Sequence, residues 1–255
     1  MARDVGAQSW ICRGCWDQMH MPIPIRGLLS LPFRAFGISH SKMNPNICTI
    51  CERAFRRVQR QRHVTVAATI LFADIRGFTQ LSERIGAAGL SDIVGTFQDH
   101  CARRIWAQDG IVNKQMGDGL MAIFNFPIRN GDHAGAAIRA ALDIQRHCHP
   151  ALAALLSRLD LAGTGSLGVG IGVHSGSVEI GEFSTDRSDF TAIGSVVNLA
   201  ARLESAAAGG EVLVSAPAAA LAPDLTRDAT IRTLQLKGFD KPVQAHVLHV
   251  GSSSP

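Results

Sequence analysis

The strongest constraint on the fold comes from a pair of short apolar segments that are joined by a turn. The segments are Ile111 to Met116 and Leu120 to Phe126, and Gly117-Asp118-Gly119 separates them. Asp-Gly pairs suit the positive φ that tight hairpins need, so we predict a β-hairpin with Asp118 at its tip. An Asp in a turn is often there for local structural reasons, and the local sequence alone favours that reading of Asp118.

A second acidic residue follows an apolar strand. Residues Val64 to Phe72 have the pattern of a strand, and Asp74 comes two residues after it. A bare carboxylate at the end of such a strand costs stability unless something pairs with it. If the hairpin pairs beside this strand, Asp74 and Asp118 meet at one end of the sheet. Two carboxylates placed in this way offer the hard oxygen ligands that Mg²⁺ prefers.

Helical and strand patterns alternate through the rest of the chain. We expect helices over 90–107, 132–159 (with an interruption at Pro150) and 196–207, and strands over 167–174, 178–183, 211–214, 231–236 and 243–250. This order predicts an α+β fold in which helices cover one face of a mixed sheet.

Three glycines alternate along one of the predicted strands. Gly168, Gly170 and Gly172 imitate a dinucleotide-binding loop, but the strand-loop-helix unit of such a loop is absent from the sequence around them. They indicate instead a bare strand face against which a helix packs closely.

The positive charge of the chain lies in its N-terminal quarter. Residues 1–65 contain ten basic and three acidic side chains (net +7), and residues 66–255 contain fifteen and eighteen (net −3), which together give +4. A nucleic-acid partner would need basic charge on the main domain, so we expect none. The run from Cys51 to His63 is basic and helix-like. We therefore predict a basic Cys-rich module over 1–62, a main domain over 63–250 and a tail over 251–255.

Two Cys-x-x-Cys pairs lie in the N-terminal module. They are Cys12 with Cys15 and Cys48 with Cys51, and 32 residues separate the pairs. This is the two-knuckle form of a four-cysteine zinc site. A Pro- and Gly-rich segment without an obvious core of its own gains stability from such a metal. We predict a structural Zn²⁺ here, with reduced, unliganded cysteines or a redox switch as the alternatives.

The sequence contains no predicted transmembrane segment. The longest charge-free stretch, Leu161 to Val178, includes six glycines and is too polar to span a bilayer. The N-terminus lacks the apolar core of a signal peptide, and we expect a cytoplasmic protein. The segment Ile25 to Phe36 mixes Leu, Phe and Arg. We expect it to dock onto the main domain, with contact to an anionic membrane surface as the lesser alternative.

Three motifs together resemble the catalytic motifs of the class III nucleotide cyclases. They are the segments Phe72 to Thr79, Asn113 to Gly119 and Phe190 to Arg202, and the resemblance covers roughly 64–250. It implies a class III cyclase catalytic domain, with a ferredoxin-like mixed sheet and helices. It also implies a head-to-tail homodimer with two sites at the subunit interface and two Mg²⁺ or Mn²⁺ per site. With Thr191 in the third motif, the sequence resembles the Thr-containing subset of the family.

The resemblance implies the roles of five residues on one subunit. Asp74 and Asp118 are the expected metal carboxylates, and the carbonyl of Ile75 is a further metal ligand. The backbone around Phe78 and Thr79 is expected to cradle the phosphates. One ion would lower the pKa of the ribose 3′-hydroxyl and the other would bind the triphosphate.

The resemblance places further substrate-binding residues around the nucleotide. Asn198 is expected to orient the ribose, and Arg202, four residues later on the same helix face, to meet phosphate charge. Lys237 aligns with a phosphate-contacting lysine. Lys114 is donor-only, which suits adenine N1 and opposes the N1–H of guanine, and Thr191 can accept from the adenine N6 amine.

We therefore expect an adenylate cyclase that converts ATP to 3′,5′-cyclic AMP and pyrophosphate. One alternative is a guanylate cyclase. The other is a weakly active nucleotide-binding regulatory module whose basic N-terminus binds a partner.

Overall fold

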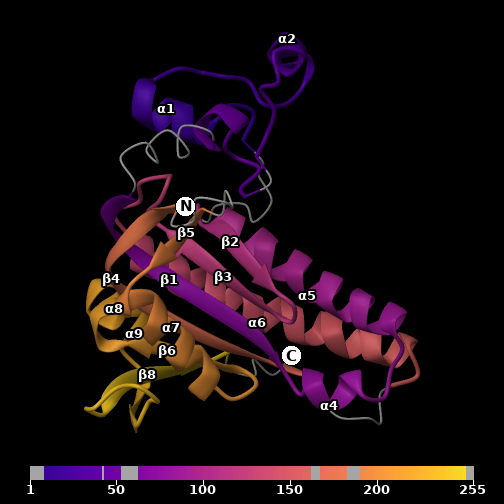
Figure 1. Ribbon diagram of the computed structural model, residues 1–255, viewed down its shortest axis with the longest axis vertical. Helices are drawn as coiled ribbons and strands as arrows, with labels where there is room; N and C mark the ends of the chain where they lie inside the picture. Colours follow the sequence, from indigo (N-terminus) through magenta and orange to yellow (C-terminus); the bar gives the residue numbers. More distant parts are fainter. Residues whose placement is uncertain (1–8, 42, 53–62, 162–166, 183–189, 251–255) are drawn as a thin grey trace.

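The computed structural model describes residues 9–41, 43–52, 63–161, 167–182 and 190–250 (Figure 1). Its strands are β1 His63–Arg76, β2 Ile111–Met116, β3 Gly119–Phe124, β4 Gly168–Glu182, β5 Phe190–Ile193, β6 Glu211–Ser215, β7 Thr230–Leu234 and β8 Val243–His249. Its helices are α1 Arg13–Met19, η1 Leu28–Ser30, α2 Leu31–Ala35, α4 Phe78–Ser82, α5 Ala87–Ala107, α6 His133–Arg158, α7 Ser195–Ala206, α8 Ala216–Leu221 and α9 Pro223–Thr226.

The strands form one mixed sheet. Its order is β2-β3-β1-β4-β6-β8-β7, and β5 pairs with β4 outside this path. The pair β4–β6 is parallel, and the other strand pairs are antiparallel. The predicted α+β class, with a mixed sheet, helices and a Cys-rich N-terminal segment, is confirmed.

Both faces of the sheet are covered by helices, so the expectation of a single covered face was wrong. Side chains alternate along a strand. In β1, Leu71, Ala73 and Ile75 join the apolar cluster that contains α5 and α6, whereas Ile70 and Phe72 join the cluster that contains α7. Helices α6 and α7 thus lie on opposite sides of β1 (Figure 1).

Two predicted interruptions, one between strands and one within a helix, are absent from the described residues. The two strands predicted over 167–174 and 178–183 are joined in the structure as the single strand β4, because β1 continues to pair with it through Ser175, Gly176 and Ser177. Pro150 lies inside α6 without ending it. The short elements α4, β5, α8 and α9 were not predicted, because four to six residues are too few to show a clear period.

The glycines of β4 let α7 approach the sheet closely. A Cβ atom on Gly172 would lie 2.2 Å from the backbone nitrogen of Glu204 and 2.4 Å from the carbonyl oxygen of Ala200, both in α7. The prediction of a bare strand face beneath a helix is confirmed. This contact fixes the height of α7 above the sheet.

The described part of the N-terminal module lies beyond one end of the sheet (Figure 1). The side chains of Leu28, Leu29 and Phe36 are 83%, 77% and 83% exposed, so the expectation that the 25–36 segment docks onto the main domain was wrong for these residues. Most of the predicted connecting helix, the boundary near 62 and the 251–255 tail lie outside the described residues.

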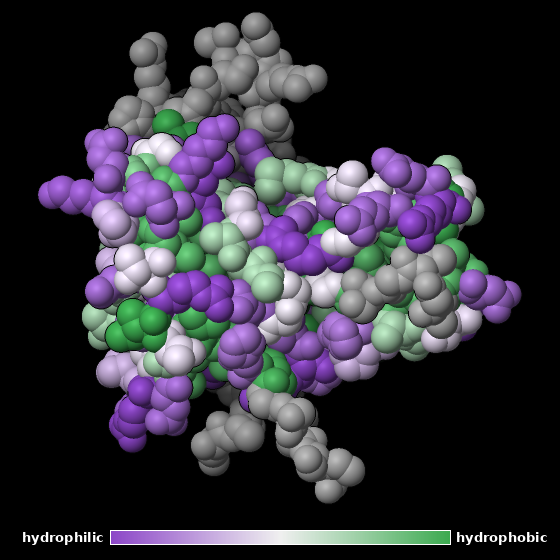
Figure 2. Space-filling model, turned by 90° about the horizontal axis from the view of Figure 1, so that it is seen from below, coloured by the Kyte–Doolittle hydropathy of each residue, from purple (hydrophilic) through white to green (hydrophobic). Residues whose placement is uncertain are grey.

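The opposite end of the molecule carries α4 and β8. On this side, hydrophilic side chains are interspersed with hydrophobic ones (Figure 2). Among the helices that the structure describes, none is long and apolar enough to cross a membrane.

Candidate active site

Asp74 and Asp118 lie beside each other at one end of the sheet. Strand β1 pairs with β3 so that Asp74 stands opposite Gly119, the residue after Asp118. The backbone N–H of Ile75 donates a hydrogen bond of 3.1 Å to the carbonyl oxygen of Asp118. The turn takes its positive φ of 65° at Gly117, one residue earlier than the Asp-Gly pair suggested. The hairpin therefore brings the two acidic residues together, as the predicted pairing required.

This corner of the sheet has an excess of negative charge. The pKa of Asp74 is raised to about 6, mainly by burial and in addition by the charges of Asp118 and Glu204, which together outweigh the lowering effect of Arg76. Burial also raises the pKa of Glu204. Adjacent carboxylates with one neighbouring cation form a suitable site for a hard divalent ion.

Arg76 connects this acidic corner to α7. Its Nη1 donates to Asp74 Oδ2 at 2.7 Å, its Nη2 donates to Glu204 Oε1 at 2.5 Å, and its Nε donates to the carbonyl oxygen of Ala207 at 2.9 Å. The sequence had not predicted a role for Arg76. The signal was available in part, because residues two apart on a strand share a face and Arg76 is two residues from Asp74.

The chain turns into α4 directly after β1. Gly77 has a φ of 84° and precedes the first residue of α4, Phe78. In the described part of the chain, no side chain forms a capping hydrogen bond at the start of this helix. Phe78 is half-buried and Thr79 is exposed, whereas the side chain of Ile75 is buried at the end of β1. The backbone of Phe78 and Thr79 thus follows Asp74 within one short turn.

Lys114 and Thr191 come from β2 and β5, two strands that are not paired in the sheet but contact each other through a side-chain hydrogen bond. The hydroxyl of Thr191 in β5 donates to Oδ1 of Asn113 in β2 at 3.4 Å, and Lys114 is the next residue of β2. The pairing of β2 with β3 shifts register between Val112 and Lys114, which places a bulge at Asn113. Lys114 is half-buried and lines a cavity of about 360 Å³.

Asn198, Arg202 and Lys237 are exposed. The first two lie on the outer surface of α7, and Lys237 lies between β7 and β8. The side chain of Arg202 has no hydrogen bond or ion pair with any residue that the structure describes. None of the side-chain hydrogen bonds and ion pairs among the described residues joins these three side chains to Asp74 or Asp118. A single chain therefore presents the two sets of predicted site residues separately.

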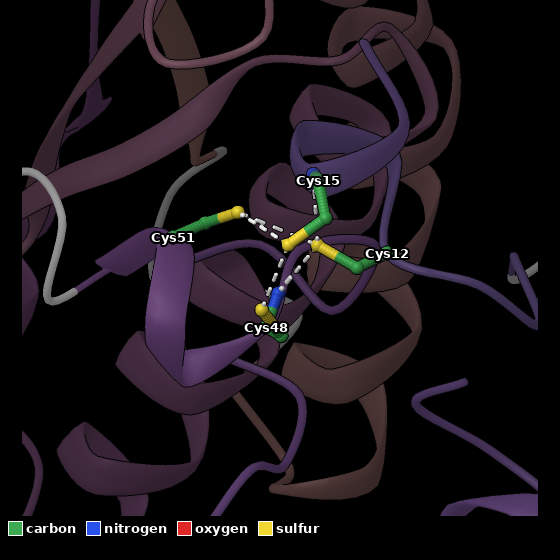
Figure 3. A group of neighbouring side chains, drawn as sticks. All are labelled: Cys12, Cys15, Cys48 and Cys51. Carbon is green, nitrogen blue, oxygen red and sulfur yellow. Dashed lines mark hydrogen bonds between the residues drawn. The ribbon is translucent and has the colours of Figure 1, made fainter. Parts of the chain in front are cut away.

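The four N-terminal cysteines converge on one point (Figure 3). All are buried, and their sulfur atoms all lie within 4.8 Å of one another. The Sγ of Cys15 is 3.3 Å from that of Cys51 and 3.5 Å from that of Cys48, and the Sγ of Cys12 is 3.5 Å from that of Cys51. Burial raises the pKa of the Cys15 thiol. The spacing of the two Cys-x-x-Cys pairs thus predicted a cluster that the structure contains.

The main domain matches a known family. Residues 58–250 match the family model described as the adenylate and guanylate cyclase catalytic domain. The chain is 29% identical over 173 residues to adenylate cyclase 1 of Rhizobium meliloti, and 29% identical over 169 residues to an adenylate cyclase of Anabaena cylindrica. These matches cover 67% and 65% of this chain but 25% and 33% of the relatives, so the chain spans a third or less of each of these two relatives.

The solved structures of similar fold include proteins named as adenylyl cyclases and proteins named as guanylyl cyclases. The adenylyl cyclase CyaB from P. aeruginosa is 31% identical, with a TM-score of 0.64, and the match covers 73% of this chain and 95% of that one. The guanylyl cyclase Cya2 is 29% identical, with a TM-score of 0.67, and the match covers 75% and 96%. Overall similarity therefore does not select between the two purines.

Proposed function

Because the chain belongs to the family of adenylate and guanylate cyclase catalytic domains, we propose that it is an adenylate cyclase that converts ATP to 3′,5′-cyclic AMP and pyrophosphate. The observation that carries this proposal is the convergence of Asp74 and Asp118 at one end of the sheet, together with a free face of α7 bearing Asn198 and Arg202. These are the two halves of a nucleotide cyclase site.

The acidic corner fits two Mg²⁺ or Mn²⁺ ions. Asp74 and Asp118 supply carboxylate oxygens, and the carbonyl of Ile75 is the further ligand that the family resemblance implies. When bound, the ions would lower the pKa of the ribose 3′-hydroxyl and offset the charge of the triphosphate. The uncapped backbone N–H groups of Phe78 and Thr79 follow at once in the chain and suit phosphate oxygens.

A second copy of the chain completes the site in this proposal. Asn198 orients the ribose, and Arg202 donates to the oxygens on which charge develops as the 3′-oxygen attacks the α-phosphorus. Lys237 adds a positive charge near the phosphates. All three are exposed in one chain. A head-to-tail homodimer would place them against the Asp74 and Asp118 of the other subunit.

The choice of adenine rests on the polarity of hydrogen bonds. Lys114 has only donors, so it satisfies N1 of adenine and leaves the N1–H of guanine facing another donor. Thr191, whose side chain contacts that of Asn113, has a hydroxyl oxygen that accepts from the N6 amine. A site that leaves the polar groups of the wrong purine unpaired discriminates against it.

The proposal is tested by incubating the purified chain with ATP and Mn²⁺ and measuring cyclic AMP. We expect product that is lost in Asp74→Ala, with Asp99→Ala as the matched control, because Asp99 is 75% exposed on α5. If the unaltered chain makes no more cyclic AMP than Asp74→Ala, the proposed cyclase activity is contradicted. GTP turnover equal to or better than ATP turnover would identify a guanylate cyclase instead.

The shared site is tested by mixing two inactive variants. Asp74→Ala and Arg202→Ala remove residues from opposite halves of each site. A mixed dimer has one site with both defects and one intact site, so random exchange at equal amounts restores about a quarter of the activity. A mixture as inactive as its components, despite exchange measured with tagged chains, would contradict the head-to-tail dimer.

A further inference from the structure

We propose that Cys12, Cys15, Cys48 and Cys51 bind one zinc-type divalent ion, and that this ion holds residues 43–48 against β2 so that its occupancy sets the position of Lys114. The metal site is independent of the proposed function. The effect on the substrate rests on the role that we propose for Lys114.

The sulfur atoms enclose the volume of a single ion. Zinc–sulfur bonds of about 2.3 Å in a tetrahedron place the sulfurs about 3.8 Å apart. Three of the sulfur–sulfur distances in the cluster, 3.3, 3.5 and 3.5 Å, lie just below this value, and every pair lies within 4.8 Å. A small outward movement of the sulfurs accommodates one tetrahedral ion. Four thiolate ligands favour zinc over the oxygen-seeking ions of the acidic corner.

The backbone around the cluster is arranged to support charged sulfur. The N–H of Cys48 points at Cys12 Sγ at 3.1 Å, and the N–H of Cys15 points at the same sulfur at 3.4 Å. Ile47 in the same segment and Ile128 of the main domain are buried against the cysteines and shield them from water. Metal sites commonly have such an outer layer, which holds the ligands in place.

The segment next to the cluster is anchored on the main domain. Arg13, which follows Cys12, forms an ion pair with Asp109 at the turn before β2. The side-chain amide of Asn44, which is fully buried, donates to the carbonyl oxygen of Gly110 at 2.9 Å. The indole N–H of Trp106 donates to the carbonyl oxygen of Met43 at 2.7 Å. Residues close to each of the two Cys-x-x-Cys pairs therefore contact the end of α5 and the turn that leads into β2.

A further hydrogen bond joins Met43 to β2, the strand that carries Lys114. The N–H of Val112 donates to the carbonyl oxygen of Met43 at 3.2 Å. The bulge in β2 follows directly, between Val112 and Lys114. A bulge redirects the side chains beside it. Met43 and Lys114 also line the same cavity of about 360 Å³.

The ion is expected to act on substrate affinity. Loss of the ion frees Cys48 from the cluster, releases the 43–48 segment and loosens β2 where Lys114 would meet the purine. The reacting phosphate is met by other residues. The KM for ATP should therefore change more than kcat.

The metal site is tested on the full chain, purified under reducing conditions, by metal analysis. We expect about one zinc per chain, much less in Cys48→Ser, and about one in the control Cys148→Ala, which removes a buried thiol outside the cluster. Much less than one equivalent in the unaltered chain, or an unchanged content in Cys48→Ser, would overturn the site.

The link to β2 is tested with a variant that leaves the cysteines intact. Trp106→Phe deletes the N–H that holds Met43, and Trp16→Phe is the same change on the exposed surface of α1. We expect Trp106→Phe to keep its zinc, to exchange the amide hydrogens of β2 faster and to raise the KM for ATP severalfold, with Trp16→Phe unchanged.

Zinc content and hydrogen exchange do not depend on catalysis, so they distinguish a failure of this proposal from a failure of the cyclase assignment. An unchanged exchange rate in β2, in both Trp106→Phe and the zinc-free Cys48→Ser, would overturn the link. An unchanged KM together with faster exchange would overturn the proposed effect on Lys114.

Discussion

The guanidinium of Arg76 bridges Asp74 and Glu204, with 2.7 Å from Nη1 to Asp74 Oδ2 and 2.5 Å from Nη2 to Glu204 Oε1. Asp74 belongs to the acidic corner, whereas Glu204 belongs to α7, which also carries Asn198 and Arg202. In the dimer that we propose, these two parts of one chain serve different sites. Arg76 would thus connect the metal carboxylate of one site to the arginine-bearing helix of the other.

Replacing Arg76 should impair both the metal carboxylate Asp74 and the position of α7. Hydrogen bonds to charged groups contribute about 1.5–3 kcal/mol each, so we expect Arg76→Gln to lower kcat about 10- to 100-fold. Arg76→Lys keeps the positive charge but not the planar guanidinium, so its kcat should lie between those of the unaltered chain and Arg76→Gln. The control Arg84→Gln changes an exposed arginine just beyond α4. Steady-state kinetics at saturating Mn²⁺ measure the effect, and wild-type kcat in Arg76→Gln would contradict it.

The raised pKa of Asp74 predicts a pH dependence of Mn²⁺ binding. The folded carboxyl loses its proton at about pH 6, compared with 3.8 for a free Asp. Because the proton competes with the metal, the affinity for Mn²⁺ measured without nucleotide should fall about tenfold for each pH unit below 6. Binding titrations at pH 5, 6 and 7.5 would show this, and an affinity independent of pH would contradict it.

The same shift has a consequence for stability in the absence of metal. The folded protein binds this proton more tightly than the unfolded chain, so the group stabilises the fold as the pH falls from 7 to about 4. Asp74→Asn lacks the titration. As the pH falls from 7 to about 4, the unfolding free energy of the unaltered chain should therefore rise relative to that of Asp74→Asn. Denaturant unfolding in the presence of a chelator measures this difference. Parallel pH profiles would contradict the shift.

Lys114 should control the choice of purine. Lys114→Glu replaces a donor with an acceptor for the N1–H of guanine, so the ratio of kcat/KM for ATP to that for GTP should fall by at least about tenfold. Gln115→Glu introduces the same side chain at the exposed next position and should leave the ratio unchanged. A ratio that stays constant in Lys114→Glu would show that Lys114 does not contact the base.

Gly172 should tolerate no side chain. In Gly172→Ala the new methyl group meets the backbone of Glu204 and Ala200, so α7 must move or the fold must give way, at a cost of about 1–3 kcal/mol. Gly95→Ala in α5 meets nothing within 4 Å and should stabilise by about 0.5–1 kcal/mol. Denaturant midpoints that shift in opposite directions would support this packing, and a neutral Gly172→Ala would contradict it.

The features predicted from the sequence were local ones. The Gly117-Asp118-Gly119 turn and the apolar strand before Asp74 predicted the two elements, and the carboxylates were expected to meet only if these elements paired, as they do in the structure. The spacing of the cysteines predicted the cluster. The bond from Arg76 to Glu204 spans 128 positions in the chain and depends on how closely α7 lies on β4. Local patterns contain no such information, and for the same reason the covering of both sheet faces was missed.

The contacts around Asn44 have a consequence for how this protein divides into parts. A chain cut to the family match would begin at residue 58. It would retain Gly110, Trp106 and Val112 but lose the residues that complete their hydrogen bonds, and it would separate Asp109 from Arg13. The part of the chain that matches the cyclase family therefore shares hydrogen bonds and an ion pair with residues that lie outside the match.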